Sequence, residues 1–256
     1  MFDSLVDRLA TVTPKHPLPM RTTFRDCFLV NFRMAPAVLA AVLPTPLQPD
    51  LYEGQAFLSV VIADMDRMRP AFLPALFGVT YQQVVYRAVV RSGDQRGVFF
   101  LRSDADNRLM VAMGNLLSFF RFHRARIVRT RGADRHHVDL VTDPSDHADI
   151  HATFEPPRQP PTDPDAPASL FPDAAAAQAF LVELYTAFRP SASGETLDRV
   201  RIKRGAWHIQ LMDAPRARFD FMDGSQAFPG GSTELDSVIY VRDIEYYWHT
   251  LERGAR

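Results

Sequence analysis

The chain lacks several residue types that mark particular classes of protein. It has one cysteine, Cys27, in 256 residues. A single cysteine excludes an intramolecular disulfide framework and a thiolate metal cluster, and it is typical of a reducing cytosol. Lys15 and Lys203 are the only lysines, so a Schiff base or an amine general base has just two candidates.

Excess charge and long apolar runs are also missing. The formal net charge is -1, so no long-range field would draw the protein to nucleic acid or to an anionic membrane. No run approaches the roughly 20 apolar residues that a membrane-spanning helix needs. The N-terminus carries acidic residues where a signal peptide would be basic. We therefore expect a cytoplasmic protein with no nucleic-acid partner and no membrane partner.

What is present is a series of short apolar segments separated by turns and prolines. Alternating or continuous apolar stretches predict strands, and helical spacing predicts helices. The predicted strands cover 24–32, 56–65, 84–90, 98–101, 136–141, 149–154, 199–202, 206–211, 217–221 and 237–241. The predicted helices cover 2–10, 36–43, 109–120 and 173–188. Many strands with few helices between them favour a mainly antiparallel α+β fold.

We expect one domain over residues 1–256. The stretch 155–169, EPPRQPPTDPDAPAS, is dense in proline and is predicted to be a surface loop within that domain. No internal repeat divides the rest of the chain.

The stretch from residue 101 to 126 combines several local signals. It is predicted to form a turn built on Asp104 and Asp106, then a helix, then a strand that begins near Phe122. The prediction matters because this stretch is also where a family resemblance is most specific.

Two sequence patterns contain residues that could bind a metal ion, but the spacing of those residues does not fit a metal site. A calcium loop that begins at Asp104 would need glycine and glutamate where Leu109 and Asn115 stand. His147 and His151 would lie about 13 Å apart on a strand, too far to chelate one ion. We expect no metal and no cofactor.

Four islands of sequence together carry a family resemblance. They are PAVLAAVLPTPLQPDLYEGQAFLSVV, Tyr81–Arg87, Asp104–Leu109 and Phe122–Arg126. They resemble the DUF2071 (YqjF-like) family, an uncharacterised branch of the acetoacetate decarboxylase-like superfamily. Weaker echoes extend the resemblance over nearly the whole chain. The resemblance implies a cone-like closed β-barrel with peripheral helices, an enclosed ligand cavity and a homo-oligomer.

The chain departs from the decarboxylases of that superfamily at the reactive positions. Their segment resembling G-R-E-x-x-G-x-P-K-K, which supplies the Schiff-base lysine, falls on Gly114 to His123. Phe122 and His123 stand where the lysines would be, and Gln83 replaces a glutamate. We therefore do not expect Schiff-base decarboxylation, unless Lys203 reaches the cavity from another strand.

Three residues are candidates for catalysis. His123 is the residue near the reactive position that can move a proton near neutral pH, although a structural role as a hydrogen-bonded barrel histidine is favoured over that role. Gln83 can hydrogen-bond a carbonyl oxygen but cannot act as a general base. Tyr81 belongs to the same segment, and both residues are also open to purely structural roles.

Four residues are candidates for ligand binding. Arg87 and Arg126 can hold a carboxylate or phosphate through a planar guanidinium, or they can lie on the outer face of a strand. Phe122 and Trp207 are predicted to be cavity wall or core.

Two functional hypotheses follow. The first is a small-molecule enzyme, a lysine-independent lyase, hydratase or cyclase that acts on a carbonyl or carboxylate compound in the cavity. The second is a non-catalytic protein that binds a metabolite, such as an anionic one, on the same scaffold. The absence of a complete catalytic constellation favours the second, and the superfamily resemblance favours the first.

Overall fold

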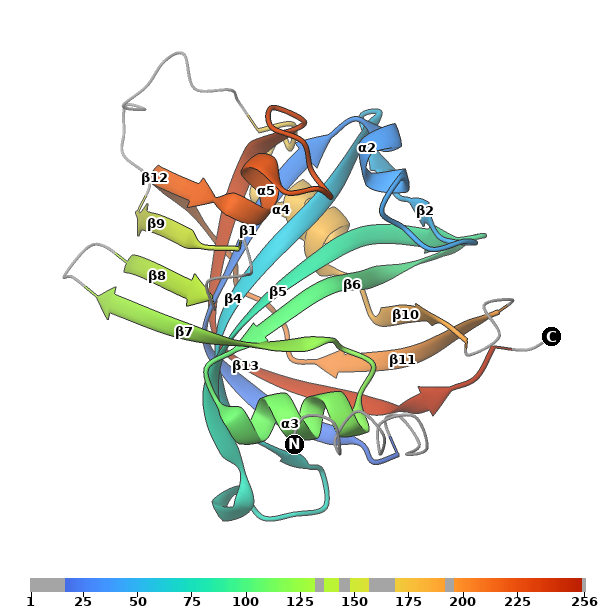
Figure 1. Cartoon of the computed structure of the whole chain (residues 1–256), viewed down its shortest axis with the longest axis vertical. Coiled ribbons are helices and arrows are strands. Elements are labelled where there is room, and N and C mark those ends of the chain that lie inside the picture. The colour runs from blue at the N-terminus through green and yellow to red at the C-terminus, as the bar shows by residue number, and fades with distance from the viewer. Residues whose placement is uncertain (1–16, 132–135, 143–147, 157–168, 192–195, 255–256) are drawn as a thin grey trace.

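The computed structural model describes residues 17–131, 136–142, 148–156, 169–191 and 196–254. The described strands form one 13-stranded mixed sheet with a few short helices around it (Figure 1). The helix predicted over 2–10 and most of the loop predicted over 155–169 lie outside the described residues. In the part of the chain that the structure covers, no helix is long and apolar enough to cross a membrane.

The elements follow one another in this order along the chain. The strands are β1 (Met20–Met34), β2 (Gln48–Pro49), β3 (Leu51–Tyr52), β4 (Gln55–Pro70), β5 (Val79–Ser92), β6 (Gln95–Ala105), β7 (Phe122–Arg131), β8 (His136–Thr142), β9 (Ile150–Glu155), β10 (Thr186–Pro190), β11 (Leu197–Arg204), β12 (Gln210–Phe219) and β13 (Thr233–Glu252). The helices are α2 (Pro36–Ala40), η1 (Ala75–Phe77), α3 (Arg108–Leu117), α4 (Ala174–Ala177), η2 (Gln178–Val182) and α5 (Asp220–Gly224).

Long antiparallel strands form the centre of the sheet. β1 pairs with β13 on one side and with β4 on the other, and β4, β5 and β6 follow as antiparallel neighbours. Two pairings are parallel, β6 with β7 and β6 with β10. The prediction of a mostly antiparallel α+β fold is confirmed.

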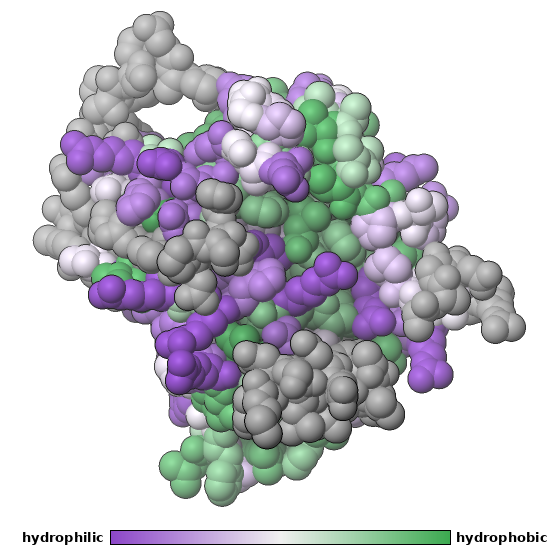
Figure 2. Space-filling model, viewed as in Figure 1, coloured by the Kyte–Doolittle hydropathy of each residue, from purple (hydrophilic) through white to green (hydrophobic). Residues whose placement is uncertain are grey.

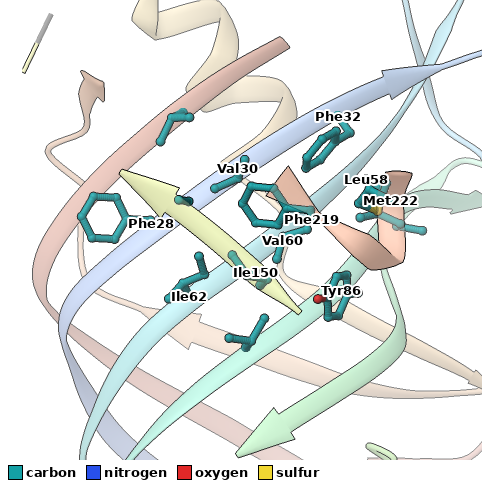
Figure 3. Close-up of a cluster of buried hydrophobic side chains, with 14 of the residues drawn as sticks. Phe28, Val30, Phe32, Leu58, Val60, Ile62, Tyr86, Ile150, Phe219 and Met222 are labelled. Atoms are coloured by element: carbon teal, nitrogen blue, oxygen red, sulfur yellow. The ribbon is translucent and has the colours of Figure 1, made fainter. Parts of the chain in front are cut away.

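Both faces of the central strands are covered, so alternate residues enter two different apolar clusters. On β1, Phe28, Val30 and Phe32 enter the first cluster, while Cys27 and Leu29 enter the second. Figure 3 shows the first cluster, in which side chains of β1, β4 and β5 meet those of β9, β12 and α5. The second cluster lies on the opposite face and contains the cavity described below.

The helix predicted over 173–188 is too long. Helical structure ends at Val182, and Thr186–Pro190 form β10, which pairs with β6 and β11. Tertiary pairing outweighs the helical pattern there, because Ala187 and Phe188 find partners on two strands.

Strand β12 replaces two predicted strands. It runs from Gln210 to Phe219, where strands over 206–211 and 217–221 were expected, and α5 begins at Asp220. The register with β9 shifts between Asp213 and Arg216, which is where Pro215 falls. Proline removes a backbone donor, so such an irregularity is where a strand tolerates it.

Candidate functional site

A mostly apolar cavity lies on the second face of the sheet. Its volume is about 270 Å³. Its walls come from β1, β4, β5, β6, β7, β11 and β13, and α3 runs along one side. α3 and the tip of the β4–β5 hairpin lie at the same end of the molecule (Figure 1). This size is near the lower end for small-molecule sites.

Strand β5 supplies the polar side of the cavity. Tyr81, Gln83, Val85 and Arg87 alternate along the strand and all line the cavity. This alternation follows from the two-residue period of a strand, which turns Val84 and Tyr86 into the first apolar cluster. The three predicted polar residues of this segment therefore lie on one wall.

Arg87 is a buried cation without a carboxylate partner. Its side chain is 6% exposed, and it forms no ion pair with any described residue. Its Nη2 donates a 2.8 Å hydrogen bond to the carbonyl of Leu181, while its buried Nε has no partner among the described residues. Burial lowers its pKa, and the nearby charge of Arg204 lowers it further. An uncompensated buried charge is costly, and the unpartnered Nε leaves a hydrogen-bond donor available inside the cavity.

Further hydrogen-bonding groups line the same wall. The hydroxyl of Tyr81 donates a 3.1 Å hydrogen bond to Oε1 of Gln83. Burial, and then the charge of Asp106, raises the pKa of Tyr81 well above its ordinary value, so the phenol stays protonated. On β6, Ser103 faces the cavity with a buried hydroxyl that has no described partner. These groups can bind a polar atom of a ligand.

The remaining wall is aromatic and rich in methionine. Phe24 and Tyr246 are stacked with ring centroids 4.3 Å apart, and Trp248 lies 5.0 Å from Tyr246. Five methionines join them: Met20, Met65, Met68, Met110 and Met113. Methionine and aromatic surfaces accept apolar bodies of varied shape.

The predicted residue Phe122 lies in the cavity wall, where a side-chain clasp holds it. Asn115 on α3 donates a 2.9 Å hydrogen bond to the carbonyl of Phe122 and accepts a 2.8 Å bond from its amide. The ring lies against Gly114, the one residue of α3 classed as buried. This clasp fixes α3 along the cavity.

His123 does not line the cavity. Strand alternation turns it to the opposite side from Phe122, and its side chain is 43% exposed. Its Nδ1 lies 3.5 Å from Oδ1 of Asp104, which is fully buried and accepts two 2.9 Å bonds from Nε of Arg102. His123 and Gln83 therefore do not line the same space. Asp104 belongs to strand β6, not to a turn, and Asn107 caps α3.

The other two predicted binding residues also lie outside the lining. Arg126 is exposed on β7. Trp207 is 6% exposed and lies behind the wall, with its ring 6.3 Å from Tyr246 and the guanidinium of Arg204 at 4.6 Å. Lys203 is exposed, while its neighbour Ile202 faces the cavity, so no described lysine reaches it.

Sequence reasoning missed several residues of the wall. Ser103 was missed because the predicted strand ended at residue 101, and its alternation with Ala105 would have indicated its face. Tyr246 and Trp248 are distant in sequence and reach the cavity through the β1–β13 pairing. No local pattern distinguishes them from ordinary core aromatics.

The described lining is poorly equipped for acid–base chemistry. It contains no lysine, histidine, cysteine, aspartate or glutamate. Its ionisable groups are Arg87, Tyr81 and Tyr246, and burial raises the pKa of both tyrosines. The arrangement can hold an anion and hydrogen-bond a carbonyl, but no described lining group would exchange a proton readily near neutral pH.

Comparison with known sequences gives one family and one relative of interest. Residues 21–245 match the family DUF2071, described as an uncharacterized conserved protein. The uncharacterized protein YqjF of Bacillus subtilis (strain 168) is 26% identical over 140 residues, which are 54% of this chain and 57% of that protein. The alignment thus spans little more than half of either chain.

Comparison with solved structures extends the likeness to nearly the whole chain. Acetoacetate decarboxylase from Legionella pneumophila matches with a TM-score of 0.63 and 16% identity, over 93% of this chain and 87% of that one. The enduracididine biosynthesis enzyme MppR, complexed with pyruvate, matches with a TM-score of 0.59 and 12% identity, over 94% and 91% of the two chains. At such identities the likeness establishes a shared fold.

Proposed function

The chain belongs to the DUF2071 family, and we propose that it binds a small, largely apolar carboxylate non-covalently in the cavity lined by β5. Arg87 binds the carboxylate, and the Gln83 amide and the Ser103 hydroxyl bind a further oxygen of the ligand. The aromatic and methionine wall encloses the apolar body.

The observation that carries this proposal is the state of Arg87. A guanidinium inside a mostly apolar cavity, with a buried and unused Nε, loses hydration without gaining an anion in return. A ligand carboxylate would replace that hydration through charge-assisted hydrogen bonds. The helix η2 replaces part of the lost hydration, because the carbonyl of Leu181 near its end accepts one hydrogen bond from Arg87.

The scaffold supports an enclosed site. The pairings of β5 with β6 and of β11 with β13 return the strand order on itself, which supports the cone-like closed barrel that the family resemblance implies. The structure of MppR complexed with pyruvate is consistent with a small carboxylate as ligand for this fold. At 12% identity, the MppR structure does not indicate which residues of this chain would hold a ligand.

The test compares acids with their methyl esters. Thermal shift and calorimetry would measure binding of medium-chain fatty acids and aromatic 2-oxo acids, each against its methyl ester. We expect the acids to bind and the esters to bind at least about tenfold more weakly, since a charge-assisted bond is worth roughly 1.5–3 kcal/mol. In Arg87→Met the preference for the acid should disappear.

Arg126→Gln is the matched control, because it removes an exposed arginine outside the cavity. It should leave the preference for the acid unchanged. Arg87→Met keeps the volume and removes an uncompensated charge, so it should remain folded. Equal binding of acid and ester by the unchanged protein would contradict the proposal, and so would an unaltered preference in Arg87→Met.

An enzyme on the same site is the second candidate, and the Tyr81–Gln83 hydrogen bond favours it. The phenol orients the Gln83 amide, which could polarise a carbonyl group of a lyase, hydratase or cyclase substrate. Incubation with 2-oxo acids followed by NMR would detect conversion. A product that forms with the unchanged protein and not with Gln83→Leu would favour the enzyme. Turnover that also survives His123→Ala would remove His123 from the mechanism.

A further inference from the structure

Exposed apolar side chains gather around the opening of the cavity. We call them the apolar rim: Leu18, Phe72, Leu76, Phe77, Leu109 and Met113, with exposures of 39%, 68%, 87%, 65%, 57% and 40%. Four of them also line the cavity, and Phe72 and Leu76 belong to the β4–β5 loop that contains Phe77. Figure 2 shows this hydrophobic surface over the tip of that hairpin, at the bottom of the view.

The rim is unusual for this molecule. The other large apolar side chains that are exposed in the described chain lie singly in separate parts of the sequence: Leu51, Val128, Tyr185 and Leu211. Scattered residues of this kind are ordinary, but a contiguous group marks a binding surface. The rim joins the cavity wall through Leu18, Phe77, Leu109 and Met113, which belong to both.

The segments that carry most of the rim are basic. Residues 67–78 and 107–131 contain arginine but no aspartate or glutamate, in a chain whose formal net charge is -1. Arg108, the first residue of α3, and Arg121, which follows the helix, are exposed and form no ion pair with a described residue. A local excess of positive charge therefore flanks the rim.

The base of the hairpin adds further arginines, although acids balance some of them. Burial lowers the pKa of Arg69, and the charges of Arg21 and Arg67 lower it further, so the three lie near one another. Asp66 pairs with Arg67, and Glu245 lies 3.8 Å from Arg21. Arg69 forms no ion pair with a described residue, and neither do Arg108 and Arg121 beside α3.

We propose that the apolar rim docks on the surface of an anionic phospholipid membrane. Exposed phenylalanine and leucine enter the boundary between headgroups and acyl chains, and the arginines beside α3 contact lipid phosphates. The net charge of the whole chain gave no reason to expect this contact, but a membrane surface responds to the local charge within about one Debye length. Docking in this orientation turns the cavity opening toward the bilayer.

The test is flotation of the full chain with vesicles of phosphatidylcholine alone or mixed with phosphatidylglycerol. We expect binding to the mixed vesicles that weakens as salt is raised. The double variant Phe72→Asn and Leu76→Asn should bind at least about tenfold less, because it removes the two most exposed apolar anchors. The double variant Arg108→Gln and Arg121→Gln should lose the preference for the anionic lipid.

Matched controls come from other faces of the molecule. Leu211→Asn removes an exposed leucine of β12, and Arg242→Gln removes an arginine that is 67% exposed on β13. Both should bind vesicles like the unchanged protein, and circular dichroism should show all variants folded. The proposal would be overturned if the unchanged protein did not bind vesicles, or if the control variants lost as much vesicle binding as the two double variants. Self-association that Phe72→Asn and Leu76→Asn abolish would also overturn it, because a second copy would then be the occupant.

Discussion

Tyr81 and Gln83 are two residues apart on β5 and are joined by a 3.1 Å hydrogen bond from the phenol to the amide oxygen. Neighbours at this spacing lie on the same face of a strand, and here that face is the cavity wall. Because the amide oxygen of Gln83 accepts the hydrogen bond from the phenol, the amide nitrogen points away from Tyr81 and can donate to a ligand.

Replacing Tyr81 by phenylalanine tests that orientation. We expect a loss of about 0.5–1.5 kcal/mol of unfolding free energy, measured by urea denaturation, because one buried hydrogen bond disappears. Binding of a 2-oxo acid should weaken more than binding of a simple carboxylate of equal length, since the amide is then free to turn. Equal effects on the two ligands would show that Tyr81 supports packing alone.

The buried pair Arg102–Asp104 is predicted to be a major contributor to stability. Asp104→Ala should lower the unfolding free energy by about 3–5 kcal/mol, because the guanidinium of Arg102 stays buried without this carboxylate. Glu252→Ala is the control, since its pair with Arg201 is exposed and should be worth less than about 1 kcal/mol. Similar losses in both variants would contradict the prediction.

Gly114→Ala is predicted to disturb the α3 clasp. A Cβ at this position would lie 2.5 Å from the ring of Phe122, which cannot move freely while Asn115 holds its backbone. We expect a loss of about 1–3 kcal/mol by urea denaturation, together with weaker ligand binding. Gly205→Ala should change stability by less than about 0.5 kcal/mol, because nothing lies within 4 Å of its Cβ.

Stability at alkaline pH should depend on Cys27. Burial raises the pKa of this thiol from 9.0 to about 12, although the charges of Arg87 and Arg129 lower it in part. The folded thiol therefore keeps a proton that the unfolded chain releases, so stability is unaffected below the unfolded pKa and falls as pH rises from there to the folded pKa.

Urea denaturation of the unchanged protein and of Cys27→Ala, from about pH 8 to about pH 11, would measure this dependence. The variant should show a shallower decline, and the difference isolates Cys27 from the buried tyrosines that titrate in the same range. The native thiol should also resist alkylation until denaturant is added. Rapid alkylation of the native protein would contradict its burial.

Much of the scaffold could be predicted because its signals are local. The predicted strand over 84–90 did not reach Tyr81 and Gln83, although the two-residue period of a longer strand is enough to put them on one face with Arg87. The islands that resemble DUF2071 indicated the fold. The absence of lysine at the reactive position gave the expectation that the chain does not use Schiff-base chemistry there, and Lys203 is exposed.

The sequence alone determined the faces of individual strands, the scarcity of reactive groups and the family of the chain. Tertiary structure decided which face borders the cavity: it turned Phe122 inward and His123 outward, and it ended the late helix at Val182. It also brought the Leu181 carbonyl to Arg87, 94 residues away, and left that arginine with no carboxylate partner among the described residues. The reason is that periodicity acts over a few residues, whereas enclosure and charge pairing depend on which distant strands become neighbours.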